Sequence, residues 1–144
     1  MPHAALALDI DQTLTTADPV AVSNLSAFAG AERVPMYVNT ARAQAYCDHP
    51  DDTTLTVVKD ATSHFCRPPG GDPVYHKVAN MERIAQRAGV NPRCAVLVDD
   101  RPENVLAVEK AGFQGILVDG RFGITDDVVE EVKTRLSDCR LRPH

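Results

Sequence analysis

The stretch Ala-Leu-Ala-Leu-Asp-Ile-Asp-Gln-Thr-Leu-Thr, residues 5–15, decides how the chain is expected to fold. An apolar run over 4–8 predicts a buried parallel strand, which stops at the carboxylates Asp9 and Asp11, followed by Thr13. In open α/β sheets the ligand site lies beyond the carboxyl ends of the strands, so these acids are expected to face a site. Two carboxylates this close repel each other unless a cation lies between them or one is protonated. Metal binding and acid–base chemistry are therefore the first hypotheses.

Length and composition indicate one folded domain over residues 1–144. The 144 residues are 44% hydrophobic and 24% charged, and no linker, repeat or low-complexity tract divides them. The net charge of −5 argues against a nucleic-acid backbone as the main partner.

The sequence gives no sign of membrane insertion or secretion. No apolar run reaches the roughly 20 residues that span a bilayer, and the N-terminus lacks the features of a secretion signal. No membrane partner is expected, and the predicted location is the cytoplasm. Four cysteines form no CxxC pair, so reduced thiols are predicted rather than disulfides: Cys47, Cys66, Cys94 and Cys139.

Apolar segments of strand and helix type alternate along the chain. Beyond 4–8, strands are expected over 34–38, 55–58, 95–98 and 115–118, and helices over 19–29, 41–47, 74–88, 102–111 and 126–136. Residues 61–73 carry three prolines and two glycines and are predicted to form a loop. The alternation predicts an α/β fold, a doubly wound three-layer sandwich of Rossmann-like type with a mostly parallel five-stranded sheet.

Polar side chains follow three of the expected strands where each strand ends: Asp9 and Asp11, then Thr40, then Asp99 and Asp100. Lys77 begins the helix that leads into the fourth strand, which places it near the same edge of the sheet. Carboxylate oxygens suit a hard cation, and the shortage of His and Cys at these strand ends favours Mg²⁺ over zinc. A magnesium ion, an ammonium and a hydroxyl together form an anion site of the kind that phosphoryl transfer needs.

This arrangement resembles the haloacid dehalogenase (HAD) superfamily of phosphohydrolases from residue 4 to about residue 118. The four family motifs stand here, in family order, as Asp9-Ile10-Asp11-Gln12-Thr13, Thr40, Lys77 and Asp99-Asp100. The resemblance implies a Mg²⁺-dependent phosphomonoester hydrolase that works through an aspartyl-phosphate. Dehalogenases lack an Asp at the position of Asp11 and transport ATPases carry Thr there, so the resemblance favours a phosphomonoesterase.

The resemblance also implies a role for each motif residue. Asp9 would attack phosphorus, and Asp11 would protonate the leaving oxygen and then activate water. Thr40 and Lys77 would hold the phosphoryl oxygens. The metal would be bound by Asp9, Asp11 through its backbone carbonyl, Asp99 and Asp100. One position departs from the family: Gln12 stands where many relatives carry Gly, and it is expected to alter the turn after Asp11.

The two places where relatives insert a cap domain are short here, at residues 14–18 and 59–75. The chain is therefore similar to capless members with an open site, in which oligomerisation into a homo-oligomer can supply the missing lid. The expected partner is a phosphorylated substrate, either a small metabolite or a phosphoprotein. Nucleic acid is the least attractive substrate because the chain is acidic.

Alternatives stay open for several single residues. Lys59 rivals Lys77, and Thr40 is an alternative cap for the helix expected to start at residue 41. His76 is expected to be a loop residue rather than a catalyst. Arg42 is expected at the surface, with contact to substrate as the alternative, whereas Asn104 either supports the metal ligands or faces solvent.

Two alternatives concern the function as a whole. Cys47-x-His49 and His64-x-Cys66 have ligand types compatible with tetrahedral zinc. Cys66-Arg67-Pro68 faintly resembles the zinc loop of some capless sugar-phosphate phosphatases, although both elements of that loop follow the third strand there, whereas Cys47 and His49 precede it here. The alternative interpretation is that these Cys and His residues are scattered in a surface loop and bind no metal. The second alternative is that the chain is not an enzyme but a HAD-like module for binding or regulation. Measuring whether phosphate is released distinguishes this alternative from a phosphatase.

Overall fold

The computed structural model describes residues 2–50 and 61–141. In this part of the chain five strands form one sheet of order β3-β2-β1-β4-β5, in which every neighbouring pair is parallel. The strands are β1 (Ala5–Leu8), β2 (Met36–Ala43), β3 (Ser63–Arg67), β4 (Ala95–Asp99) and β5 (Gln114–Leu117). Parallel pairing brings the carboxyl ends of all five strands to one edge, so the predicted α/β architecture is confirmed.

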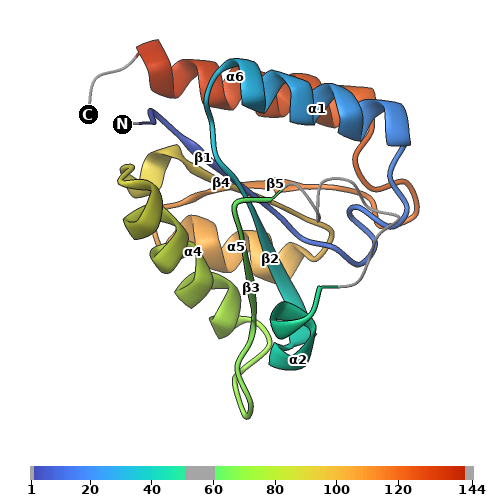
Figure 1. Cartoon of the computed structure of the whole chain (residues 1–144), viewed down its shortest axis with the longest axis vertical. Helices are drawn as coiled ribbons and strands as arrows, with labels where there is room; N and C mark the ends of the chain where they lie inside the picture. The colour runs from blue at the N-terminus through green and yellow to red at the C-terminus, as the bar shows by residue number, and fades with distance from the viewer. Residues whose placement is uncertain (1, 51–60, 142–144) are drawn as a thin grey trace.

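Helices cover both faces of the sheet (Figure 1). On one face lie α1 (Pro19–Ala31) and α6 (Asp126–Leu141), and on the other lie α4 (Tyr75–Ala88) and α5 (Pro102–Lys110). Two short elements complete the described chain: α2 (Gln44–Asp48) after β2 and the 3₁₀ turn η1 (Pro92–Cys94) before β4. None of the helices in residues 2–50 and 61–141 combines the length and the apolar character needed to cross a membrane.

The alternation of side chains along β1 explains why its sequence is apolar throughout. Leu6 and Leu8 pack into the core under α1 and α6, whereas Ala5 and Ala7 pack toward α4 and α5. All four residues are fully buried, as expected for a central parallel strand that is covered on both faces. Burying each leucine contributes about 2 kcal/mol.

The helix boundaries follow local signals in the sequence. Asp18 caps α1 by accepting a hydrogen bond from the Val20 amide at 2.9 Å, and Pro19 occupies the first helical position, as predicted. Gly89 ends α4 with a φ of 71°, in the left-handed region that favours glycine.

The third strand is not where the sequence analysis predicted it. Residues 55–58 lie outside the described residues, and β3 falls within the segment predicted to be a loop. The prolines and glycines that indicated a loop begin only at residue 68, whereas Phe65 and Cys66 are buried and β3 pairs with β2 along its length. Packing against the sheet therefore overrides the local turn signal.

The second strand is also longer than predicted. It continues to Ala43, which pairs with Arg67 after a shift in register that follows Asn39. This pairing keeps the backbone extended, so α2 starts at Gln44 instead of residue 41. Thr40 therefore lies inside a strand and does not cap a helix.

Two disulfides replace the predicted reduced thiols. Cys47–Cys66 joins α2 to β3 and Cys94–Cys139 joins η1 to α6, with Cα separations of 6.0 and 5.7 Å that suit such bonds. The partners are 19 and 45 residues apart in sequence, so only the fold brings them together. The first disulfide also overturns the zinc hypothesis, since its two sulfurs are bonded to each other and not available as thiolate ligands.

Candidate active site

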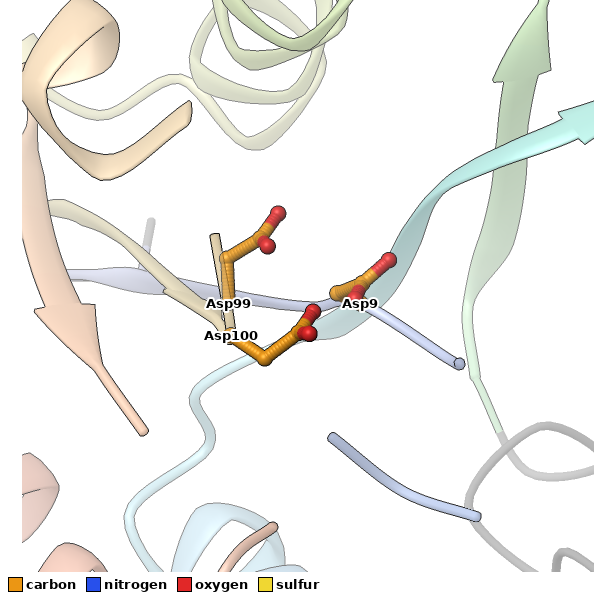
Figure 2. Close-up of side chains that lie close together, drawn as sticks. All are labelled: Asp9, Asp99 and Asp100. Atoms are coloured by element: carbon orange, nitrogen blue, oxygen red, sulfur yellow. The ribbon is translucent and has the colours of Figure 1, made fainter. Parts of the chain in front are cut away.

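Three carboxylates gather at the carboxyl ends of the two central strands (Figure 2). Asp9 directly follows β1, Asp99 ends β4, and Asp100 is the next residue. One oxygen from each lies within 4.8 Å of the other two. Asp9 and Asp99 are buried and Asp100 is half-buried, so their like charges are poorly screened by water.

Burial raises the pKa of Asp9 to about 7, with Lys77 lowering it and Asp99 raising it further. Burial also raises the pKa of Asp100, and the charge of Asp99 acts in the same direction. Both shifts indicate a site with more negative charge than its surroundings compensate. A cation would supply that compensation, and a donor set made of carboxylate oxygens fits a hard ion such as Mg²⁺.

Lys77 is fully buried in the first turn of α4, and its ammonium lies among these acids. Nζ lies 2.9 Å from Asp9 Oδ1 and 3.0 Å from Asp99 Oδ2, and it donates to the Asn39 carbonyl oxygen at 2.6 Å. The Asn39 amide in turn donates to the Lys77 carbonyl oxygen at 3.1 Å, which fixes the start of α4 against β2. The structure thus brings Lys77 to the acids, as predicted, whereas Lys59 lies outside the described residues.

Asp9 and Asp99 also accept hydrogen bonds from residues other than Lys77. Thr13 donates to Asp9 Oδ2 at 3.2 Å. Asn104 donates to Asp99 Oδ2 at 3.2 Å, and the Arg101 amide donates to Asp99 Oδ1 at 3.0 Å. Asn104 is buried, so of the two alternatives left open by the sequence it supports the acids and does not face solvent.

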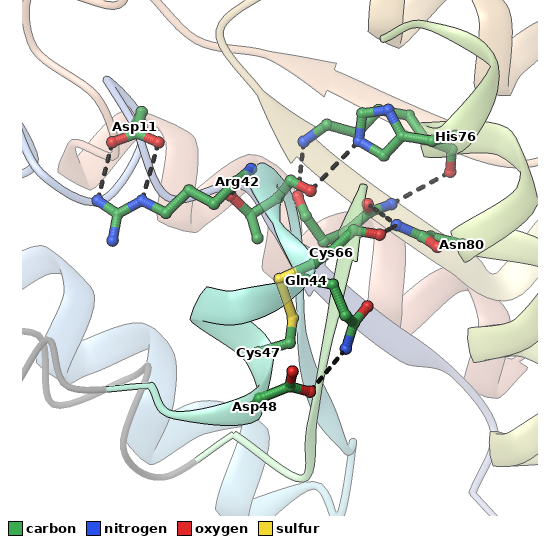
Figure 3. The surroundings of a disulfide bond; sticks show 11 residues. Asp11, Arg42, Gln44, Cys47, Asp48, Cys66, His76 and Asn80 are labelled. Atoms are coloured by element: carbon green, nitrogen blue, oxygen red, sulfur yellow. Dashed lines mark hydrogen bonds and ion pairs between the residues drawn. A yellow bond between two sulfur atoms is a disulfide. The ribbon is translucent and has the colours of Figure 1, made fainter. Parts of the chain in front are cut away.

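Asp11 lies apart from the acid cluster. Its side chain is 59% exposed, and both its oxygens accept from Arg42, at 3.1 Å from Nε and 2.9 Å from Nη2 (Figure 3). These hydrogen bonds hold the pKa of Asp11 below its ordinary value. Arg42 also stacks on the Tyr46 ring, with 4.6 Å between the guanidinium carbon and the ring centroid. Arg42 is therefore not the free surface residue that was expected, because contacts across the fold engage it.

Thr40 is fully buried within β2, and it is not among the described residues that line the cleft. Its hydroxyl accepts from the Arg42 amide at 3.1 Å, which fixes the turn that presents Arg42. The Thr40 carbonyl oxygen lies 3.2 Å from Nε2 of His76, and the other ring nitrogen of His76 lies 3.3 Å from the Asp72 carbonyl oxygen. His76 is thus a buried residue of α4, not a loop residue as predicted; burial, followed by the charge of Lys77, lowers its pKa.

A buried amide continues the polar contacts from the acids to the first disulfide (Figure 3). Nδ2 of Asn80 donates to Asn39 Oδ1 at 3.0 Å and to the Cys66 carbonyl oxygen at 3.2 Å. Together with the contacts between Asn39 and Lys77, this amide ties α4, β2 and β3 to one another beside the acids. The sequence analysis missed Asn80, since an amide in a helix carries no signal of what it faces.

The acids open onto a cleft of about 610 Å³ at this edge of the sheet. Charged and polar side chains dominate its lining, which comprises Asp9, Asp11, Gln12, Thr15, Ala41, Arg67, Pro73, Val74, Lys77, Asp99, Asp100, Arg101, Glu103 and Asn104. This volume suits a small metabolite.

The turn after Asp11 has the backbone conformation expected of a glycine. Gln12 has a φ of 62°, which costs a non-glycine residue about 1 kcal/mol. The loop between β5 and α6 braces this turn, because the Ile124 amide donates to the Thr13 carbonyl oxygen at 3.0 Å. A Cβ on Gly123 would clash with the same oxygen, so only glycine permits this approach.

The chain has the fold of the haloacid dehalogenase-like hydrolases. It superimposes on such a hydrolase from Streptococcus pneumoniae with a TM-score of 0.56 and 14% identity, over 88% of this chain and 90% of the other. It also resembles the 3-deoxy-D-manno-octulosonate (KDO) 8-phosphate phosphatase of Moraxella catarrhalis, solved with magnesium, phosphate and KDO, with a TM-score of 0.58 and 16% identity over 94% and 87% of the two chains.

A further solved structure, an uncharacterised protein from Corynebacterium glutamicum, gives a TM-score of 0.67 with 21% identity over 94% of this chain and 96% of the other. Neither a protein-family model nor a curated protein sequence matches the chain. Likeness at these identities concerns the fold, so the chemistry has to be argued from the site itself.

Proposed function

We propose that the protein is a magnesium-dependent phosphomonoester hydrolase that forms an aspartyl-phosphate on Asp9. The observation that carries this proposal is the convergence of three carboxylates and one buried ammonium at the carboxyl edge of the sheet. Asp9, Asp99 and Asp100 would hold the metal together with the backbone carbonyl of Asp11. When bound, Mg²⁺ supplies positive charge that neutralises the phosphoryl oxygens.

In the first step a carboxylate oxygen of Asp9 attacks phosphorus, and the bond from phosphorus to the leaving oxygen breaks. Lys77 both orients this carboxylate and lies where it can neutralise negative charge that develops on the phosphoryl group. Thr13 holds the second oxygen of Asp9, so the nucleophile is fixed in one orientation before substrate arrives.

Proton transfer is assigned to Asp11, which lines the cleft. It donates a proton to the leaving oxygen, then takes one from the water that attacks the aspartyl-phosphate and releases inorganic phosphate. In the free protein both oxygens of Asp11 accept from Arg42, so Asp11 has to exchange this partner for the leaving oxygen during turnover. Thr40 is buried and its hydroxyl accepts from the Arg42 amide, so it would fix the turn that carries Arg42. The contact between Thr40 and a phosphoryl oxygen that the resemblance implies stays a prediction.

Similarity to a KDO 8-phosphate phosphatase supports the phosphatase reading, although the substrate of that enzyme is not transferred to this chain. We further propose that residues 1–144 form one capless domain with an open site and that it acts on a small phosphorylated metabolite. The described chain places only residues 9–18 between β1 and α1 and residues 68–74 between β3 and α4.

The test is release of phosphate from an aryl phosphate, with Mg²⁺ and with a chelator, by the wild type and by Asp9→Asn. Turnover that needs the metal and disappears in Asp9→Asn is the expected result. Asp138→Asn, which removes a carboxylate from α6 on a part of the chain that does not line the cleft, serves as the matched control. Equal turnover by Asp9→Asn and the wild type would overturn the assignment of the nucleophile. If magnesium binds but neither turnover nor a fluoroberyllate adduct on Asp9 is found, the protein is a binding module.

A further inference from the structure

Arg67 is a cation of the cleft wall that has no acidic partner among the residues that the structure describes. It ends β3, is half-buried and lines the cleft with the acids. Within residues 2–50 and 61–141 no carboxylate lies within ion-pair distance of its guanidinium. The other two cations in the lining are paired: Lys77 with Asp9 and Asp99, and Arg101 with Glu103 at 3.5 Å.

The backbone that carries Arg67 is held in place by contacts with β2, α2 and α4. Arg67 pairs with Ala43 of β2, and the preceding residue is fixed to α2 by the Cys47–Cys66 disulfide. The Cys66 carbonyl oxygen also accepts from Asn80, which continues through Asn39 toward the acids. The base of this side chain therefore keeps a constant position relative to the reacting group, which lowers the entropic cost of binding a ligand there.

The charges of the cleft indicate what Arg67 would bind. The ammonium of Lys77 is paired with Asp9 and Asp99. Three carboxylates that lie this close together would bind a metal ion, and the phosphoryl group of a substrate would bind beside that ion and Lys77. Arg67 lies outside that set, at the end of the edge strand β3, which β2 separates from β1, and its planar fork of donors matches a carboxylate or a phosphate. A half-buried guanidinium without a counter-charge gains most from an anion supplied by the ligand.

We infer that Arg67 binds a second anionic group of the substrate, so that the substrate is a small phosphomonoester carrying a carboxylate or a further phosphate. This inference rests on the proposed function for the position of the phosphoryl group. A cleft of about 610 Å³ has room for both groups of such a metabolite.

The experiment measures binding by calorimetry with excess Mg²⁺, using phosphonates that the protein cannot hydrolyse. Butylphosphonate, 4-phosphonobutanoate and propane-1,3-diyl bisphosphonate have the same three-carbon spacing and differ only in the end group. The wild type is expected to bind the two probes with an anionic end roughly 10- to 100-fold more tightly than butylphosphonate, as expected for one charge-assisted pair. The tighter of these two probes identifies the second anion as carboxylate or phosphate.

Three variants assign the preference to a residue. In Arg67→Gln the affinity ratio is expected to fall close to one, and Arg67→Lys, which keeps the charge without the planar fork, is expected to retain part of it. Arg101→Gln removes the other arginine of the lining and is expected to keep the full preference. Equal affinity of the wild type for all three probes, or an equal loss for all three in Arg67→Gln, would show that the inference is wrong. Because binding is measured without turnover, failure of the hydrolase proposal appears separately in the Asp9→Asn assay.

Discussion

Replacing the proposed nucleophile should stabilise the protein while removing its activity. In the folded protein burial raises the pKa of Asp9 from 3.8 to about 7. At about 1.4 kcal/mol per pKa unit, an ionised Asp9 lowers the free energy of unfolding by about 4 kcal/mol at high pH. Asp9→Asn keeps the shape of the side chain without its charge. In chelator at pH 8 we therefore expect the free energy of unfolding of Asp9→Asn to exceed that of the wild type by about 2 to 4 kcal/mol.

The sign of this effect fixes its pH dependence. A carboxyl group whose pKa is raised on folding contributes stability below its unfolded pKa, and this stability is lost as the pH rises through the folded pKa. The advantage of Asp9→Asn should therefore grow between pH 3.8 and about 7 and level off above that range. At pH 4.5 it should be no more than about 1 kcal/mol.

Urea unfolding of both proteins at these pH values, with a chelator present, provides the measurement. Asp11→Asn is the matched control, because the hydrogen bonds from Arg42 lower the pKa of Asp11 and its charge is therefore favourable in the folded state. This control should lose a little stability at pH 8 where Asp9→Asn gains it. Added Mg²⁺ should narrow the gap by stabilising the wild type more. An Asp9→Asn protein that is less stable than the wild type at pH 8 in chelator would refute the reasoning.

Three further predictions concern the residues around the acids. Asn104→Ala removes the amide that donates to Asp99, so magnesium affinity should fall roughly 10-fold, measured as the Mg²⁺ dependence of Tm; an unchanged affinity contradicts this role. Arg42→Gln releases Asp11 and raises its pKa, so the acidic group in the pH profile of kcat/KM should titrate at higher pH; an unmoved profile shows that Asp11 is not that group. Replacing both cysteines of the disulfide between α2 and β3 by serine should cost about 3 kcal/mol in urea unfolding for its 19-residue separation, against about 4 kcal/mol for the disulfide of 45-residue separation. Reducing the wild type with a dithiol breaks both bonds and should cost about as much as the two replacements together, and if it costs nothing, the disulfides do not stabilise the fold.

The sequence by itself determined the architecture and the centre of the candidate site. An apolar run that stops at carboxylates predicts a strand buried on both faces whose end faces a ligand, and the alternation of strands and helices places such ends at one edge. These are local signals, because each depends on residues close in the chain. They sufficed to predict that Asp9, Lys77 and Asp99 meet.

Only the tertiary structure decided which residues surround that centre. β3 forms where pairing with β2 outweighs a nearby cluster of prolines and glycines, and both disulfides join segments that the sequence keeps far apart. The pairing of Asp11 with Arg42 and the absence of an acidic partner for Arg67 in the described chain depend on which side chains the fold brings within hydrogen-bond distance. A sequence pattern shows the type of each side chain and the periodicity of the residues near it in the chain. Which distant residue a side chain contacts is decided by how the helices and strands pack.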